Sequence, residues 1–247
     1  MFPCPCCGYY TLTECSPGTR QRCPVCYWFD CELVATFDRW ELWVSQVTFE
    51  KLGACAAEYT DRTRRPRLDE SRDPRHAIDE EPERLRIALL TDAEQKVRNA
   101  FADVTPLGRV TLGEAYRGEV NTKHHPWDWN DHDEHWWEIP DEVLDASARL
   151  AGIFSHGNYV SCVYYIAAYL MKDLRTQDNA GLFAITRPRW HGLNGDTRPP
   201  ESLLTSPQLD AVTAFLRHNA IFTPTPHTRD AATRSIPRFE LPIGSET

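Results

Sequence analysis

Two short cysteine motifs near the N-terminus decide how the first part of this chain folds. The first is Cys4-Pro5-Cys6-Cys7-Gly8 and the second, after 15 residues, is Cys23-Pro24-Val25-Cys26. Each Cys-x2-Cys turn brings two thiolates onto one metal ion, and two such turns complete a closed tetrahedron. The spacing therefore predicts a structural Zn2+ site formed by Cys4, Cys7, Cys23 and Cys26.

The other cysteines leave one question about this site open. Seven of the nine cysteines fall within the first 31 residues. The start of the chain lacks the basic and apolar regions of a secretory signal, so we expect a cytoplasmic protein with reduced thiols. Cys6 adjoins Cys7, and the spacing does not decide which of the two is a ligand. Cys15 and Cys31 read as spare thiols.

The residues around both motifs resemble a known family. Phe2-Pro3-Cys4-Pro5-Cys6-Cys7-Gly8-Tyr9, Cys23-Pro24-Val25-Cys26-Tyr27-Trp28 and the stretch 49–55 are similar to the bacterial cysteine-rich CPCC family. The family usually has acids after the aromatic pair, whereas Phe29-Asp30-Cys31 follows here. The resemblance covers about residues 2–70. It implies a small zinc-ribbon-like module of unassigned biochemistry and supplies no enzyme activity.

Composition excludes several classes of protein. Hydrophobic residues make up 41% of the 247 residues and charged residues 26%, which suits a packed core rather than a disordered chain. No stretch approaches the roughly 18 apolar residues that a membrane span needs. The net charge of -9 disfavours nonspecific binding to a polyanion, although a local basic patch remains compatible with it.

The chain divides by composition into four parts. Residues 1–60 form the cysteine-rich module, with a helix predicted over 38–59. Residues 61–89 read as a charged linker, because 61–86 holds 8 Arg, 8 Asp+Glu and three prolines. Residues 90–220 form a helix-rich domain, and residues 221–247 form a proline-containing arm, either strand-like or loose. The predicted fold class is α+β and mostly helical, with few short strands.

Within the second domain, apolar spacing places the main elements. Thr91-x-x-Glu94 fits a capping box at the start of a helix. Residues 160–175 have the broad apolar face of a central core helix. Residues 182–186 read as a short strand, and Ser206-Pro207 starts the last helix expected.

A second resemblance involves this domain. Trp137-Glu138-Ile139-Pro140, the stretch 164–171, the stretch 203–208 and Phe215-Leu216 are similar to an uncharacterised bacterial domain with a YLPAYM-like helix. The match covers about residues 90–218. Ile166-Ala167-Ala168 stands where Leu-Pro-Ala is expected. The resemblance implies a fold family without a mechanism.

One segment of the second domain has an unusual composition. Residues 124–148 contain no Lys or Arg, but four His, four Trp and eight Asp+Glu. Three interpretations stay open: a metal site using His132, Asp133 and His135, an ordered loop whose Trp side chains fill the core, or a recognition surface.

Because no phosphate-binding loop, nucleophile elbow or zinc-protease motif is present, we expect a non-enzymatic bacterial binding protein. The leading hypothesis is an immunity or antitoxin-type protein that neutralises a toxin with a basic surface. Its expected contact residues are Asp128, Asp131, Asp133, Glu134, Trp136 and Trp137. One alternative is a zinc-ribbon protein that binds nucleic acid through Arg20, Arg22, Arg64, Arg65 and Arg67. Another is a metal-dependent enzyme that uses the His124–His135 segment.

Overall fold

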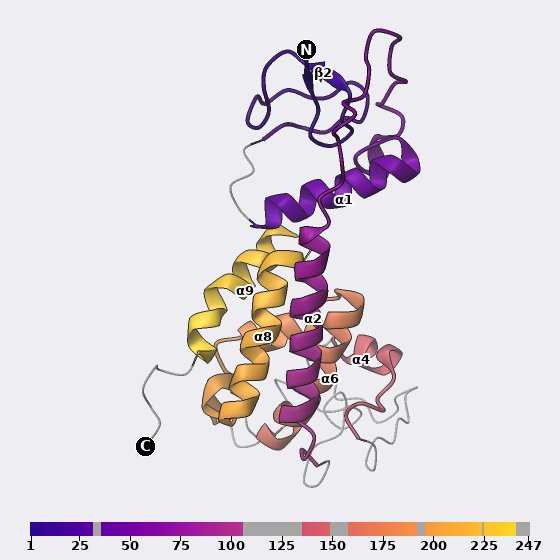
Figure 1. Cartoon of the computed structure of the whole chain (residues 1–247). Helices are drawn as coiled ribbons and strands as arrows, with labels where there is room; N and C mark the ends of the chain where they lie inside the picture. The colour runs from indigo at the N-terminus through magenta and orange to yellow at the C-terminus, as the bar shows by residue number, and fades with distance from the viewer. Residues whose placement is uncertain (32–35, 106–134, 149–157, 192–195, 224, 241–247) are drawn as a thin grey trace. The chain divides into compact units, whose positions relative to one another are not determined.

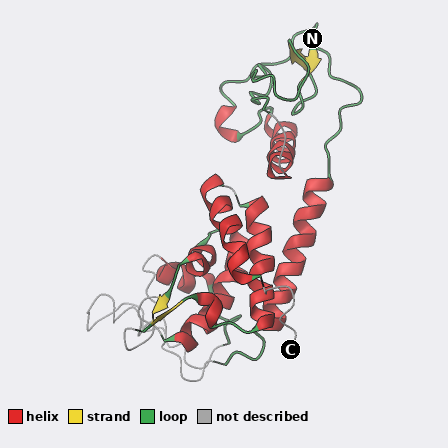
Figure 2. Ribbon diagram, turned by 90° about the vertical axis from the view of Figure 1, so that its left-hand side faces the viewer, coloured by secondary structure: helices red, strands yellow, loops and turns green. Residues whose placement is uncertain are grey.

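The computed structural model of the chain describes residues 1–31, 36–105, 135–148, 158–191, 196–223 and 225–240 (Figure 1). The chain divides into two compact units, Met1–Ile87 and Ala88–Thr247. Helices dominate the described residues, and the strands form two short antiparallel pairs (Figure 2). The structure confirms the predicted mostly helical α+β class, with a cysteine-rich part before a larger helical part.

The first unit begins with the two cysteine turns and ends in helices. Strand β1 (Phe2–Pro3) pairs with β2 (Tyr10–Leu12), and helix α1 covers Thr36–Leu52. A 3-10 turn, η1, covers Ala57–Tyr59. The helix predicted over 38–59 stops at Leu52, because Gly53 takes a left-handed conformation with φ of 73° and its N–H bonds to Phe49 O at 2.8 Å.

The segment 61–86 is not a linker over most of its length, so that prediction was wrong. Tyr10 N donates to Ser71 O at 3.0 Å, and Asp73 N donates to Gly8 O at 2.9 Å. Further along the same segment, helix α2 (Glu81–Ala100) begins. These contacts are between main-chain groups, so no side-chain pattern announces them.

The helices of the second unit share one hydrophobic core. They are α2, α4 (Asp141–Ala148), α6 (Tyr159–Thr176), α7 (Ala180–Thr186), α8 (Ser206–Phe222) and α9 (Pro226–Phe239). In α6, residues 161–162 and 164–174 are all buried, as the sequence predicts for a central core helix. Strand β3 (Trp190–His191) pairs with β4 (Thr197–Arg198), and a 3-10 turn, η2, covers Pro200–Ser202. Helices α8 and α9 lie side by side (Figure 1).

Three local predictions for the second unit were wrong. Thr91 lies inside α2, which begins ten residues earlier at Glu81, so it caps no helix. The stretch 182–186 lies in α7 rather than in a strand, because the Asp173 carboxylate accepts a hydrogen bond from Leu182 N at 2.9 Å at the start of that helix. The expected C-terminal arm contains α9, which buries Phe239 despite an internal proline.

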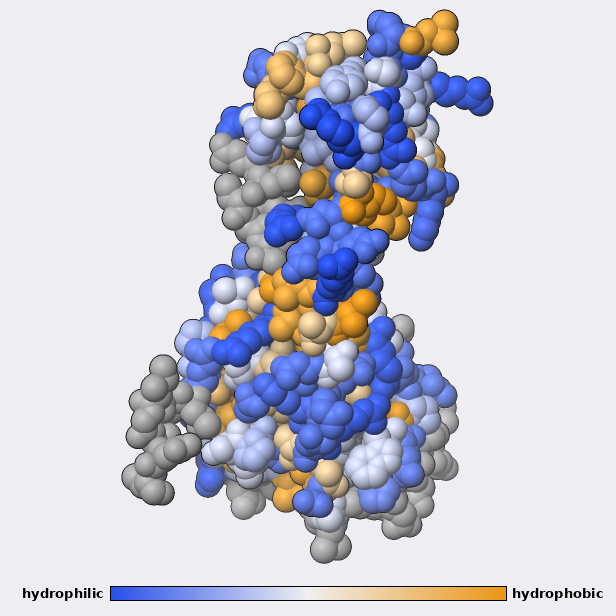
Figure 3. All heavy atoms as spheres, in the orientation of Figure 1, coloured by the Kyte–Doolittle hydropathy of each residue, from blue (hydrophilic) through white to orange (hydrophobic). Residues whose placement is uncertain are grey.

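Hydrophilic residues cover much of the face of each unit drawn in Figure 3. None of the helices in the described part of the chain has an apolar stretch of the length that a membrane crossing requires.

Candidate metal centre

The two cysteine turns bring four sulfur atoms together. The Sγ atoms of Cys4, Cys7, Cys23 and Cys26 all lie within 4.8 Å of one another, and all four side chains are buried. The Cys4–Cys26 distance is 3.7 Å and the Cys7–Cys23 distance is 3.6 Å. Four soft donors at this spacing could hold one metal ion in a closed tetrahedral site.

The two turns repeat the same hydrogen bonds. Gly8 N donates to Cys4 O and Tyr27 N donates to Cys23 O, both at 2.8 Å. Across each turn, Cys4 N donates to Tyr9 O and Cys23 N donates to Trp28 O, both at 2.9 Å. Main-chain hydrogen bonds thus hold each pair of cysteines in position without the help of a metal ion.

Gly8 occupies a position that no other residue fits. Its φ is 76°, in the left-handed region that favours glycine. A Cβ atom added there would lie 2.5 Å from Cγ of His76. Both the conformation and the close approach of His76 therefore require glycine in the first turn.

Hydrogen bonds among the thiols set their relative acidity. Those from Cys26, Cys4 and Cys7 lower the pKa of Cys23, and its Sγ also lies 3.1 Å from Thr11 Oγ1. The hydrogen bond to Cys23 raises the pKa of Cys7 and of Cys26. Since metal ligands must be thiolates, binding of a metal ion would release protons from this cluster.

The remaining cysteines lie outside the four-sulfur group. Cys6 is buried but is not a member, so geometry places Cys7 rather than Cys6 among the candidate ligands. Cys55 N donates to Cys26 O at 2.8 Å, and burial raises the pKa of the Cys55 thiol to about 12. Cys15 is exposed and Cys31 is partly exposed.

Two buried acids that the sequence did not single out support this unit. The Asp30 carboxylate accepts hydrogen bonds from Ser16 Oγ at 2.5 Å and from Thr19 N at 2.9 Å, which closes the loop between the turns. Glu70 pairs with Arg64, and that guanidinium lowers the pKa of the carboxyl to about 2. For Asp30, the only signal in the sequence is the presence of hydroxyl residues, Ser16 and Thr19, in the loop before it.

The acidic, Trp-rich segment is described only at its end. Asp128, Asp131, Asp133, Glu134, His124, His125 and His132 lie outside the described residues. Trp136 is 2% exposed and donates from Nε1 to Phe101 O at 2.9 Å, so its prediction as a contact residue was wrong. Trp137 is 46% exposed, and its ring stacks on His135 with centroids 4.3 Å apart.

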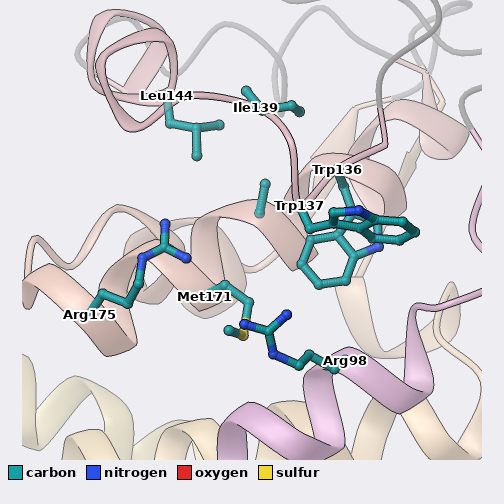
Figure 4. Close-up of a pocket in the computed structure, with 8 residues that line it drawn as sticks. Arg98, Trp136, Trp137, Ile139, Leu144, Met171 and Arg175 are labelled. Carbon is teal, nitrogen blue, oxygen red and sulfur yellow. The ribbon is translucent and has the colours of Figure 1, made fainter.

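A small cavity lies beside this tryptophan pair. Figure 4 shows both indoles against each other, with Arg98 of α2 and Met171 and Arg175 of α6 around the same space. Its volume is about 40 Å³, which has room for water molecules but not for an organic substrate. Arg175 also pairs with Asp141 at 2.6 Å.

A larger hollow of about 310 Å³ lies on the first unit. It is lined by Trp43, Val47, Ile78, Glu80, Glu83 and Arg84. Glu80 pairs with Arg84 at 3.3 Å, and Glu83 pairs with Arg86 at 2.8 Å. These ion pairs leave the rim close to neutral, so nothing selects a charged ligand there.

The geometry defines a class of protein: a module whose four clustered cysteines could hold a metal ion, followed by a helical unit. Residues 2–70 match the family described as "Cysteine-rich CPCC", and residues 90–236 match a "Family of unknown function (DUF6714)". The second match covers more than half of the chain, so the chain belongs to that family of unknown function. Both resemblances read from the sequence are confirmed, and the second extends through most of α9. No curated protein and no solved structure matches the chain.

Proposed function

We propose that this chain is a non-enzymatic binding protein of the immunity or antitoxin type, which neutralises a toxin with a basic surface by direct contact. The first unit holds structural Zn2+ at Cys4, Cys7, Cys23 and Cys26. The proposed contact residues of the second unit are Trp137, Asp128, Asp131, Asp133 and Glu134.

The chemistry of the donor set supports zinc. Four buried thiolates favour a soft or borderline metal over Mg2+ or Ca2+, and zinc and iron both accept a tetrahedral set of this kind. Metal analysis of the purified chain separates the two. We expect one zinc per chain and no visible absorption. An iron–thiolate spectrum would refute zinc, and two metals per chain would favour the metal-dependent enzyme alternative.

The observation that carries the binding function is the contrast between Trp136 and Trp137. Trp136 is fixed in the core by its hydrogen bond to Phe101 O. Trp137 lies edge-on to it, with ring centroids 5.3 Å apart, yet remains 46% exposed. An exposed indole that is already held in place loses little entropy on binding, which is typical of an interface anchor.

The net charge of the chain supports a basic partner. The charges near the indole are mixed: Glu138, the next residue, is exposed, whereas Arg98 and Arg175 line the cavity that Trp137 borders. The chain as a whole carries a net charge of -9, and a net negative charge steers an oppositely charged protein and speeds its association. Nothing in this arrangement requires a reaction at the surface.

The test is a pull-down from the source cell with three baits: the wild type, Trp137→Ala and Phe183→Ala. Phe183 is a matched control, because it is 55% exposed in the same unit but lies on α7. We expect one stoichiometric protein with the wild-type and Phe183→Ala baits and its loss with Trp137→Ala. That protein should stop growth when expressed alone and not when expressed with the wild type. A partner that is harmless alone would refute the antitoxin function, and one retained by Trp137→Ala would remove Trp137 from the interface.

A further inference from the structure

Two arginine side chains lie over aromatic rings at the second cysteine turn. The Arg22 guanidinium carbon lies 4.9 Å from the Tyr27 ring centroid and 5.2 Å from that of Phe29. The Arg62 guanidinium carbon lies 5.7 Å from Tyr27 and 5.7 Å from Tyr59. We name these five residues the arginine–aromatic surface.

The backbone of the metal module holds this surface in place. Arg22 and Phe29 face each other in an antiparallel bridge across the second turn, so their side chains lie on the same side. The segment that carries Arg62 is attached to the second cysteine turn by the hydrogen bond from Arg64 N to Pro24 O at 3.2 Å. The rings of Tyr27 and Tyr59 lie 5.0 Å apart and connect the two sides.

These two arginines differ from others of the first unit. Arg39 pairs with Asp79, Arg64 with Glu70 and Arg72 with Glu50. Arg22 and Arg62 are exposed, and neither forms an ion pair with a carboxylate among the described residues. In a chain of net charge -9, two cations placed on aromatic rings instead of acids remain available to an anionic ligand.

The aromatic groups specify the kind of anion. Phe29 is 42% exposed, so one of its faces is open to a flat ligand. Exposed rings beside guanidinium groups are the elements that proteins use to stack unpaired bases and contact the phosphates between them. We infer that the arginine–aromatic surface binds single-stranded nucleic acid, with Arg22 and Arg62 on phosphates and Phe29 against a base. A duplex, whose bases are already stacked, offers no partner to Phe29.

The experiment measures fluorescence anisotropy of a labelled oligouridine of about 12 nucleotides, within the usual site size, on the full metal-loaded chain. We expect binding that weakens as salt rises. Replacing both Arg22 and Arg62 by Gln should reduce the slope of log affinity against log salt by about 1.4, since each single-strand phosphate contact contributes about 0.7. Phe29→Ala should weaken binding about 5- to 150-fold at every salt concentration, with the slope unchanged.

Two further variants control for folding and for charge. Arg39→Gln removes one positive charge from the same unit at a residue already paired with Asp79, and it should leave affinity unchanged. Tyr27→Gly keeps the left-handed turn, removes the ring that both guanidiniums share, and should weaken binding. Metal content and circular dichroism verify that each variant is folded.

Three results would overturn the inference. One is no binding of the oligouridine by the folded wild type at low salt. Another is a loss of affinity in Arg39→Gln as large as in the double variant. The third is competition by duplex RNA, or by inorganic polyphosphate of equal charge, as effective as that of the unlabelled single strand.

Discussion

The first cysteine turn permits a sharp test of how the metal module is held together. Gly8→Ala forces a Cβ atom into a residue with φ of 76°, where it would lie 2.5 Å from Cγ and 2.8 Å from Cβ of His76. Gly53→Ala is the matched control. Gly53 has nearly the same φ, 73°, but no atom lies within 4 Å of the added Cβ.

The two substitutions share one cost and differ in another. A left-handed conformation costs an alanine about 1–2 kcal/mol, and both variants suffer this. Overpacking against a side chain costs about 1–3 kcal/mol more, and only Gly8→Ala suffers it. The atoms in the way are the Cβ and Cγ of His76, which cannot swing aside as a side-chain tip can. We therefore expect a loss of about 1–2 kcal/mol for Gly53→Ala and about 2–5 kcal/mol for Gly8→Ala.

Urea unfolding of the full chain, followed by release of zinc to a coloured chelator, reports on the first unit. Adding His76→Gly to Gly8→Ala removes all three atoms that the new Cβ would meet, so it should recover the difference between the two single variants. Equal losses for Gly8→Ala and Gly53→Ala, or no recovery in the double variant, would show that His76 does not pack against this turn.

Three other predictions concern the metal ligands and the core of the second unit. Cys7→Ser should abolish stoichiometric zinc while Cys6→Ser, at an adjacent buried thiol outside the four-sulfur group, should retain it; equal loss in both would place Cys6 among the ligands. Burial raises the pKa of Asp173 to about 7, so the protonated carboxyl supports folding below about pH 4 and this support is lost as pH rises through 7. Asp173→Asn should therefore gain stability relative to the wild type between pH 4 and pH 8, by up to about 4 kcal/mol, and thermal melts with a pH-independent difference would contradict this. Lys172→Ala should destabilise the chain by about 2–5 kcal/mol through lost packing of a buried stem, and Lys172→Met by clearly less, because Asp145 and Asp178 are 52% and 42% exposed and can be rehydrated. Equal thermal shifts for both lysine variants would instead assign the cost to the ion pairs.

The features that could be predicted from the sequence are those with a local geometric cause. A metal site built from two Cys-x2-Cys turns needs only short-range spacing, and the four sulfur atoms do come together. The core helix α6 repeats its apolar residues with helical spacing over its whole length, and this pattern does not fit a strand or a loop. Both features are specified within the segment that forms them.

The features that were missed depend on partners far along the chain. The stretch 182–186 is too short for periodicity to separate helix from strand, and the residue that starts α7 is Asp173 in another helix. The segment 61–86 is fixed to the cysteine turns by main-chain groups, which any sequence possesses. Trp136 and Trp137 are the same residue type and adjacent in the sequence, yet the first is buried and the second is exposed, because the turn directs their side chains to different sides.

The difference between the two cysteine turns connects the fold to the proposed surface. Gly8 and Tyr27 hold equivalent positions and both take the left-handed conformation, with φ of 76° and 67°. Glycine adopts this conformation freely, whereas for tyrosine it costs about 1–2 kcal/mol. Packing explains the glycine, because His76 leaves no room for a side chain at the first turn. At the second turn, the ring of Tyr27 provides a shared face for Arg22 and Arg62. The second turn therefore keeps a strained residue where the first turn has glycine, and this residue positions two exposed cations. Local strain of this kind is expected at a binding surface.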